Sequence, residues 1–198
     1  MARYVAGRLK VYLAGPDVFL DSAIEQGERK KALCAQRNLD GFSPFDNEIT
    51  SALDDTSIDR MIYRANVAMM ERCDCAVFNL SAFRGAGVDD GTAFELGYLT
   101  ALRKPCFGYV NDPLSLRQRT EQLGPLHYDE VARRWRAADG HFVEDFGNAH
   151  NLMIDNAIRE HRHEIVRAPE SRPLSDLAAF EICLEQILIH YDLTEGGF

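Results

Sequence analysis

Acidic side chains gather at three loops of the sequence, each of which follows a short apolar run. These carboxylates are Asp17, Asp46, Glu48, Asp89, Asp90 and Glu95. Two carboxylates beside an uncharged sugar can act on its glycosidic bond, because one attacks or stabilises the anomeric carbon while the other protonates the leaving group. The residue types therefore favour glycosyl chemistry, provided that the fold brings the loops together.

The same loops lack the usual features of a phosphate site. Such a site normally offers a glycine-rich cradle of backbone amides or Lys and Arg partners. The sequence has no G-x-x-x-x-G-K-[ST] segment and no G-x-G-x-x-G segment after its first apolar run.

Glu95 has two readings when its own segment is considered alone. The segment from Thr92 to Glu95 fits the S/T-x-x-E capping box, in which the glutamate returns to the backbone amide of the threonine. Asp89 and Asp90 would then favour a helix N-terminus electrostatically. A catalytic carboxylate has the same spacing, so both readings stay open at this level.

Apolar runs alternate with helical patterns along the chain. We expect strands over residues 10–15, 41–44, 74–80, 105–110 and 164–168. We expect helices over residues 22–36, 56–72, 92–103, 146–159 and 173–190. The alternation predicts an α/β fold, a Rossmann/flavodoxin-like three-layer sandwich around a five-stranded parallel sheet.

The fold would position the acidic loops. In open parallel sheets ligands bind beyond the carboxyl ends of the strands. This rule gathers residues 15–19, 46–48 and 81–95 around one pocket. The final helix, with its broad apolar surface, is expected to pack on the sheet.

Length and composition predict one domain over residues 1–198. Residues 114–145 lack clear periodicity and are interpreted as a partly helical insertion or lid. With 46% apolar residues the chain can form a sizeable core. Its formal charge of −9 argues against a nucleic acid or an anionic membrane as partner.

Targeting and metal signals are weak. No apolar stretch reaches the length of a membrane helix, and the first residues do not resemble a signal peptide. The five cysteines show no C-x-x-C spacing and are expected to be buried thiols in a reducing cytoplasm. The histidines lack metal-ligand spacing, so neither a metal site nor a cofactor is expected.

Five segments carry a resemblance to a known family. They are Tyr12-Leu-Ala-Gly-Pro-Asp-Val-Phe19, Pro44-Phe-Asp-Asn-Glu48, Asp74-Cys-Ala-Val-Phe-Asn-Leu-Ser-Ala-Phe-Arg-Gly85, Asp89-Asp-Gly-Thr-Ala-Phe-Glu-Leu-Gly97 and Asn151-Leu-Met153. Together and in this order they resemble the nucleoside 2-deoxyribosyltransferase family over most of residues 10–155. The Asp-x-Gly-Thr-x-Phe-Glu-x-Gly segment is the most specific of them.

The resemblance implies a double displacement on a 2′-deoxynucleoside. Glu95 would be the nucleophile that attacks C1′, and an incoming base or water would then take the sugar. Asp89 would protonate the leaving base, with Asp90 as the alternative. Tyr12 would orient the nucleophile. The acidic pair at 89–90 would repel a 5′-phosphate, which favours a nucleoside over a nucleotide.

Further residues would bind the substrate. The expected binding residues are Gly15, Phe19, Asp46, Glu48, Asn66, Asp90, Asn151 and Met153. Among them, Phe19 would wall the base, and Glu48 and Asn66 match positions where relatives contact it. Asn151 and Met153 match a segment that reaches a neighbouring subunit's site. The protein is therefore expected to be a homodimer or a higher homo-oligomer with shared active sites.

The resemblance is greatest to the purine-preferring branch, which shares Asp-Asn-Glu and Phe-Arg-Gly and also carries Asn at position 66. The expected partners are thus a small-molecule nucleoside, preferably a purine one, and a free nucleobase. Two alternatives remain: an N-glycoside hydrolase of nucleosides or nucleotides on the same scaffold, and a non-catalytic nucleotide-binding module. Phosphoribohydrolases with P-G-G-x-G-T-x-x-E are less similar, because no P-G-G precedes Gly91.

Overall fold

The structure is a computed structural model that describes residues 7–47 and 57–193. Its main sheet has five strands in the order β2-β1-β3-β4-β8. These strands are β1 (Leu9–Ala14), β2 (Leu39–Phe42), β3 (Cys75–Asn79), β4 (Cys106–Val110) and β8 (Val166–Arg167). All neighbouring pairs in this sheet are parallel, as the sequence predicted. The interior strands β3 and β4 are buried at every residue, which explains their near-continuous apolar sequences.

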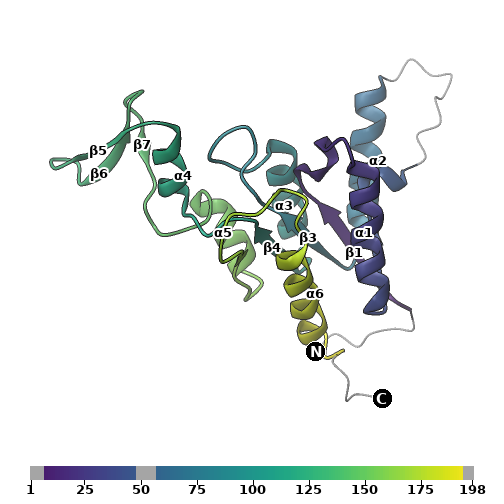
Figure 1. Cartoon of the computed structure of the whole chain (residues 1–198). Helices are drawn as coiled ribbons and strands as arrows, with labels where there is room; N and C mark the ends of the chain where they lie inside the picture. Colours follow the sequence, from purple (N-terminus) through teal and green to yellow (C-terminus); the bar gives the residue numbers. More distant parts are fainter. Residues whose placement is uncertain (1–6, 48–56, 194–198) are drawn as a thin grey trace.

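Helices cover both faces of this sheet and make the three layers visible in Figure 1. The helices are α1 (Ala23–Gln36), α2 (Ile58–Arg72), α3 (Asp90–Ala101), α5 (Leu152–Arg159) and α6 (Ala178–His190). One core cluster joins α1 and α6 to the sheet, and includes Cys34, Phe180 and Ile187. The second joins α2, α3 and α5 to the other face, and includes Met69 and Leu96. The prediction that the last helix packs on the sheet is confirmed.

Several predicted boundaries were wrong. The helix expected from residue 92 begins at Asp90, because Asp89 rather than Thr92 is its N-cap. The helix expected over 146–159 begins only at Leu152, where Asn151 caps it. The last helix begins at Ala178, and residues 173–177 form an irregular segment with a turn at 174–175. The five cysteines are free and buried, in line with the sequence prediction.

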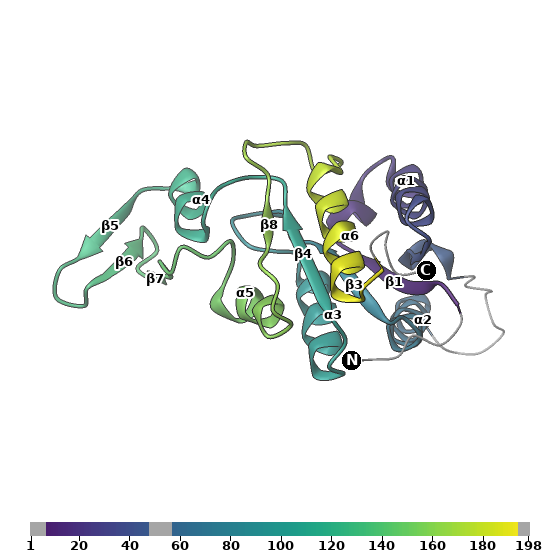
Figure 2. The same ribbon diagram turned by 90° about the horizontal axis from the view of Figure 1, so that it is seen from below.

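The segment 114–145 holds more strand than was expected. It contains α4 (Leu116–Leu123) and an antiparallel sheet of three strands, β5 (Leu126–Asp129), β6 (Arg134–Ala137) and β7 (Phe142–Val143). Both ribbon views show this sheet projecting as an arm on the side opposite α1 and α2 (Figures 1 and 2). Within the described residues, no helix is long and apolar enough to cross a membrane.

Candidate active site

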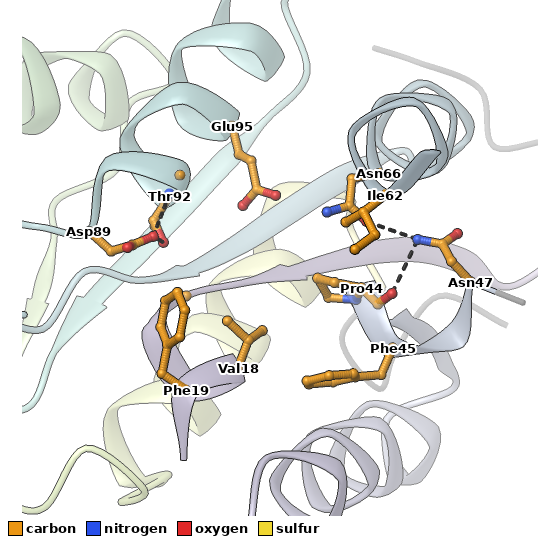
Figure 3. A pocket seen from close by; sticks show the side chains of 12 residues that line it. Val18, Phe19, Pro44, Phe45, Asn47, Ile62, Asn66, Asp89, Thr92 and Glu95 are labelled. Carbon is orange, nitrogen blue, oxygen red and sulfur yellow. Dashed lines mark hydrogen bonds between the residues drawn. The ribbon is translucent and has the colours of Figure 1, made fainter. Parts of the chain in front are cut away.

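A pocket of about 480 Å³ opens where β1, β2 and β3 end. These strands are neighbours in the sheet, so their carboxyl ends meet at one edge, where parallel sheets bind ligands. The lining residues are Gly15, Val18, Phe19, Pro44, Phe45, Asn47, Ile62, Asn66, Asp89, Gly91, Thr92 and Glu95. Figure 3 shows Glu95 and Asp89 on the α3 side, with aromatic and apolar side chains opposite them.

Tyr12 and Glu95 form the tightest polar contact at this pocket. Tyr12 lies in β1 and is fully buried, and its hydroxyl donates a hydrogen bond to Oε1 of Glu95 at 2.5 Å. Burial raises the pKa of Glu95 to about 7, and the charge of Asp89 adds to this rise, while the bond from Tyr12 opposes it. Burial and the neighbouring Glu95 hold the pKa of Tyr12 far above its ordinary value, so the phenol keeps its proton and remains the donor.

Asp89 both caps α3 and faces the pocket. Its Oδ2 atom accepts hydrogen bonds from the Thr92 amide at 2.9 Å and from the Thr92 hydroxyl at 3.0 Å. Within the part of the chain that the structure describes, Oδ1 of Asp89 accepts no hydrogen bond. The capping-box interpretation of Glu95 was wrong, since Thr92 lies inside the helix and Glu95 turns toward Tyr12.

An aromatic wall closes the side of the pocket opposite α3. The ring of Phe19 stacks on that of Phe83, with centroids 4.9 Å apart and planes inclined by 17°. The guanidinium carbon of Arg84 lies 4.7 Å from the Phe83 centroid and 5.3 Å from that of Phe19. Phe83 supports the ring of Phe19 from outside the pocket lining, whereas Phe45 lines the pocket together with Phe19. The sequence prediction named Phe19 and missed Phe45.

A buried ion pair holds the loop that carries Phe19. Lys30 Nζ lies 2.6 Å from Asp17 Oδ2, and Asn79 donates to Oδ1 of the same carboxylate at 2.9 Å. Gly15 passes so close to β3 that a Cβ atom there would lie 2.5 Å from Cβ of Asn79, and its φ of 147° also favours glycine. Asp17 therefore lies beside the pocket without lining it, and Lys30 neutralises its charge beneath the loop.

The second loop presents a different residue from the one expected. Asp46 does not line the pocket, because its carboxylate accepts from the Ser43 amide at 2.8 Å and pairs with Lys31 at 2.6 Å. These contacts close the short 3-10 helix η2 (Pro44–Asp46). Asn47 lines the pocket instead and donates to Asn66, which the sequence had named. Glu48 lies outside the described residues.

Three other predicted residues lie away from the pocket lining. Asp90 is exposed in the first turn of α3. Asn151 caps α5, accepting from the Met153 amide at 3.0 Å and donating to Glu144 at 2.6 Å. The side chain of Met153 is 70% exposed.

The pocket offers a carboxylate, a second carboxylate and an apolar aromatic wall. This set suits an uncharged ligand with a flat ring, and it can supply both a nucleophile and an acid. Among residues 7–47 and 57–193 no group of three or more His, Cys, Asp and Glu side chains is arranged to hold a metal ion.

Comparison with known proteins is consistent with this geometry. Residues 11–153 match the family described as nucleoside 2-deoxyribosyltransferase. An uncharacterized protein of Schizosaccharomyces pombe is 33% identical over 161 residues, which cover 75% of this chain and 76% of that protein. The structure of a 2-deoxyribosyltransferase from Leishmania mexicana is 30% identical, with a TM-score of 0.63, covering 89% of this chain and 97% of that one.

A conserved protein of Enterococcus faecalis is 20% identical with a TM-score of 0.54, covering 92% of this chain and 100% of that one, and it shares the fold. The match to the family extends from the strand that holds Tyr12 to the helix that begins after Asn151, and so includes every loop that forms the pocket. The chain therefore belongs to the nucleoside 2-deoxyribosyltransferase family.

Proposed function

We propose that this protein exchanges nucleobases on 2′-deoxyribonucleosides through a covalent deoxyribosyl intermediate on Glu95. The observation that carries the proposal is the bond from Tyr12 to Glu95 inside the pocket at the carboxyl ends of the strands. A carboxylate that is oriented by a buried phenol and walled by aromatic rings suits attack on a sugar whose base is stacked beside it.

In the first half-reaction, the oxygen of Glu95 that does not accept from Tyr12 attacks C1′. The glycosidic C1′–N bond breaks and its electron pair passes to the base nitrogen, which takes a proton from Asp89. In the second half-reaction, a nitrogen of the incoming base attacks C1′ and returns a proton to Asp89, while the bond between C1′ and Glu95 breaks. The absence of a 2′-hydroxyl eases the oxocarbenium-like transition states on both sides of the intermediate.

The geometry of Asp89 supports its assignment as the acid. Oδ2 is occupied by two hydrogen bonds from Thr92, which hold the carboxyl group at the start of α3. The other oxygen can carry the proton that the leaving base needs. Asp90 is exposed outside the pocket lining, so Asp89 is the better candidate of the two.

We further propose a preference for purines. The rings of Phe19 and Phe45 line the pocket and form an aromatic wall against which a two-ring base can lie, and the pocket volume of about 480 Å³ has room for it. The amide of Asn66 places a neutral hydrogen-bonding group rather than a carboxylate beside the base position.

The same proposal includes a homo-oligomer of at least two chains. Met153 is 70% exposed and Leu152 beside it is 37% exposed, at the start of a helix that lies next to α3. Exposed apolar side chains at the start of a helix suit a contact with a second copy. This supports the expectation that Asn151 and Met153 complete the site of a neighbouring chain.

A single incubation tests the activity. Purified protein is mixed with 2′-deoxyinosine and free adenine, and the products are separated by chromatography. New 2′-deoxyadenosine supports transfer, whereas hypoxanthine and free deoxyribose without a new nucleoside would instead indicate an N-glycoside hydrolase. If neither a nucleoside nor a nucleotide is turned over, the chain is a binding module and the proposal fails. The Glu95→Ala variant serves as the matched blank.

A further inference from the structure

Two asparagine side chains meet at the edge of the pocket. Asn47 follows η2, and its Nδ2 atom lies 3.1 Å from the carbonyl oxygen of Pro44 and 2.8 Å from Oδ1 of Asn66. Asn66 belongs to α2, which covers the sheet face that also carries α3. Both asparagines line the pocket, so their contact couples the loop after β2 to α2 at the pocket wall.

The partners determine which way each amide points. A backbone carbonyl can only accept, so the atom of Asn47 that faces Pro44 must be its NH₂ group. The second hydrogen of that group is directed to Asn66, and the atom it meets there must be an oxygen. The NH₂ group of Asn66 is thereby turned to the other side.

Figure 3 shows the result of this chain of contacts. The amide nitrogen of Asn66 points to the side of the pocket where Glu95 lies, and the amide oxygen of Asn47 points away from the pocket. Within the described residues, Nδ2 of Asn66 makes no hydrogen bond, so its donor capacity is left for a ligand.

We propose that Asn47 is a positioning residue for base selection, which locks the amide of Asn66 so that the pocket presents an N–H donor to the nucleobase. The inference rests on the proposed function, since it assumes a base in this pocket. The base that fits is one that offers an acceptor, a ring nitrogen or an exocyclic carbonyl oxygen, at the edge facing Asn66. A base with C–H at that place would leave the donor without a partner on the base, which lowers the affinity of the protein for that base.

Asn47 has a simpler reading as a turn residue, because its bond to Pro44 ties the end of η2. The two readings differ in what the Asn47→Asp variant does. A carboxylate of the same shape cannot donate to Pro44 or to Asn66, so Asn66 is expected to rotate its amide, donate to Asp at position 47 and present its oxygen to the pocket. A turn residue alone would change stability or overall rate without changing the choice of base.

The test compares adenine with 1-deaza-, 3-deaza- and 7-deazaadenine as acceptors, with 2′-deoxyinosine as donor. Each analogue replaces one acceptor nitrogen by C–H. In the wild-type protein one analogue is expected to show a kcat/KM about 10-fold below that of adenine, the scale of one neutral hydrogen bond. In Asn47→Asp this penalty is expected to disappear. Asn66→Asp removes the donor while keeping the bond from Asn47, and is expected to lose the penalty as well.

Asn156→Asp is the matched control. Asn156 also donates from Nδ2 to a backbone carbonyl, that of Leu152 at 2.8 Å, but it is exposed on α5 and does not line the pocket. This variant is expected to keep the 10-fold penalty.

Each outcome separates the inference from the proposed function. The positioning role would be overturned if Asn47→Asp lowered kcat/KM equally for all four bases or left the 10-fold penalty unchanged. It would also be overturned if the wild type showed no penalty with any analogue. In each of these cases the proposed transfer activity would stand. If the wild type turns over no nucleoside, the proposed function fails, and calorimetric titration with the same bases decides the inference. The inference is supported if adenine and one deaza analogue differ in Kd for the wild type and Asn47→Asp abolishes this difference. It is overturned if all four bases bind the wild type equally or without measurable affinity.

Discussion

The phenol of Tyr12 donates to the carboxylate of Glu95 at 2.5 Å, although the two residues are 83 positions apart in the chain. β1 buries the phenol and α3 brings the carboxylate to it, so neither residue is placed by its own local sequence. This bond orients the carboxylate, and it opposes the effect of burial on the pKa of Glu95. The proposed chemistry therefore depends on this contact.

Removing the phenol should shift the pH dependence upward. The attacking species is the carboxylate and the leaving base needs a proton from Asp89, so kcat/KM should follow a bell-shaped pH profile in which Glu95 sets a midpoint at about 7 in the wild type. Because the bond from Tyr12 lowers the pKa of Glu95, Tyr12→Phe should move this midpoint to higher pH and reduce kcat by about 10-fold. The control is Tyr98→Phe, which removes an exposed Tyr–Glu bond to Glu71 and should leave the profile in place. An unshifted midpoint in Tyr12→Phe would contradict the coupling.

Glu95→Gln should abolish transfer and stabilise the fold at alkaline pH. The folded-state pKa of about 7 exceeds the ordinary value of 4.5, so the folded protein holds this proton more tightly than the unfolded chain does. The wild type consequently loses stability as pH rises between these values. At pH 8 the neutral variant should gain about 3 kcal/mol in free energy of unfolding, and the gain should vanish near pH 4. Urea unfolding at both pH values measures it, and an equal difference at the two would refute the burial argument.

Asp89→Asn should slow glycosidic cleavage by about 100-fold, the scale of a lost general acid. Asn is as good an N-cap as Asp, so α3 should keep its start and the free energy of unfolding should change little. Asp90→Asn, at the exposed neighbouring position, should change the rate by less than about 3-fold. Pre-steady-state release of the base measures the step, and a reversal of the two effects would assign the acid to Asp90.

Lys30→Met should destabilise the protein by about 3 to 5 kcal/mol, because it leaves the carboxylate of Asp17 buried without its cation. The side chains of this pair are only 5% and 9% exposed. The neighbouring Lys31 makes its two ion pairs at the surface, so Lys31→Met should cost no more than about 1 kcal/mol. Denaturant unfolding of both variants checks the contrast, and equal losses would contradict the buried role of Lys30.

Met153→Ala should raise the KM for nucleoside by about 10-fold if a second chain uses this side chain at its site. Since Met153 is 70% exposed in one chain, the change should leave monomer stability almost unaltered. Ile24→Ala, at a 68% exposed position on α1, should leave KM unchanged. Sedimentation analysis alongside kinetics is the further check: full activity in a monomeric protein would exclude a shared site.

Much of the fold could be predicted from local sequence. The apolar runs that became β3 and β4 are buried on both faces, and a strand in that environment requires almost no polar residue, so its pattern is visible along the chain. The arm was missed because β5, β6 and β7 have only four, four and two residues and none of these residues is buried, so the strands are too short for a periodic apolar pattern to mark them.

The sequence by itself determined which residue types stand at the carboxyl ends of the strands and which family they resemble. Only the tertiary structure decided which of them face the pocket. In the sequence, Asp17 and Asp46 are carboxylates like Glu95. In the structure, Lys30 pairs with Asp17 and the next residue of α1, Lys31, pairs with Asp46, and both pairs lie outside the pocket lining. Asn47 and Asn66 acquire their orientation only from each other and from the carbonyl of Pro44. Charge pairing and amide orientation are set by neighbours in space, and spacing along the chain does not record them.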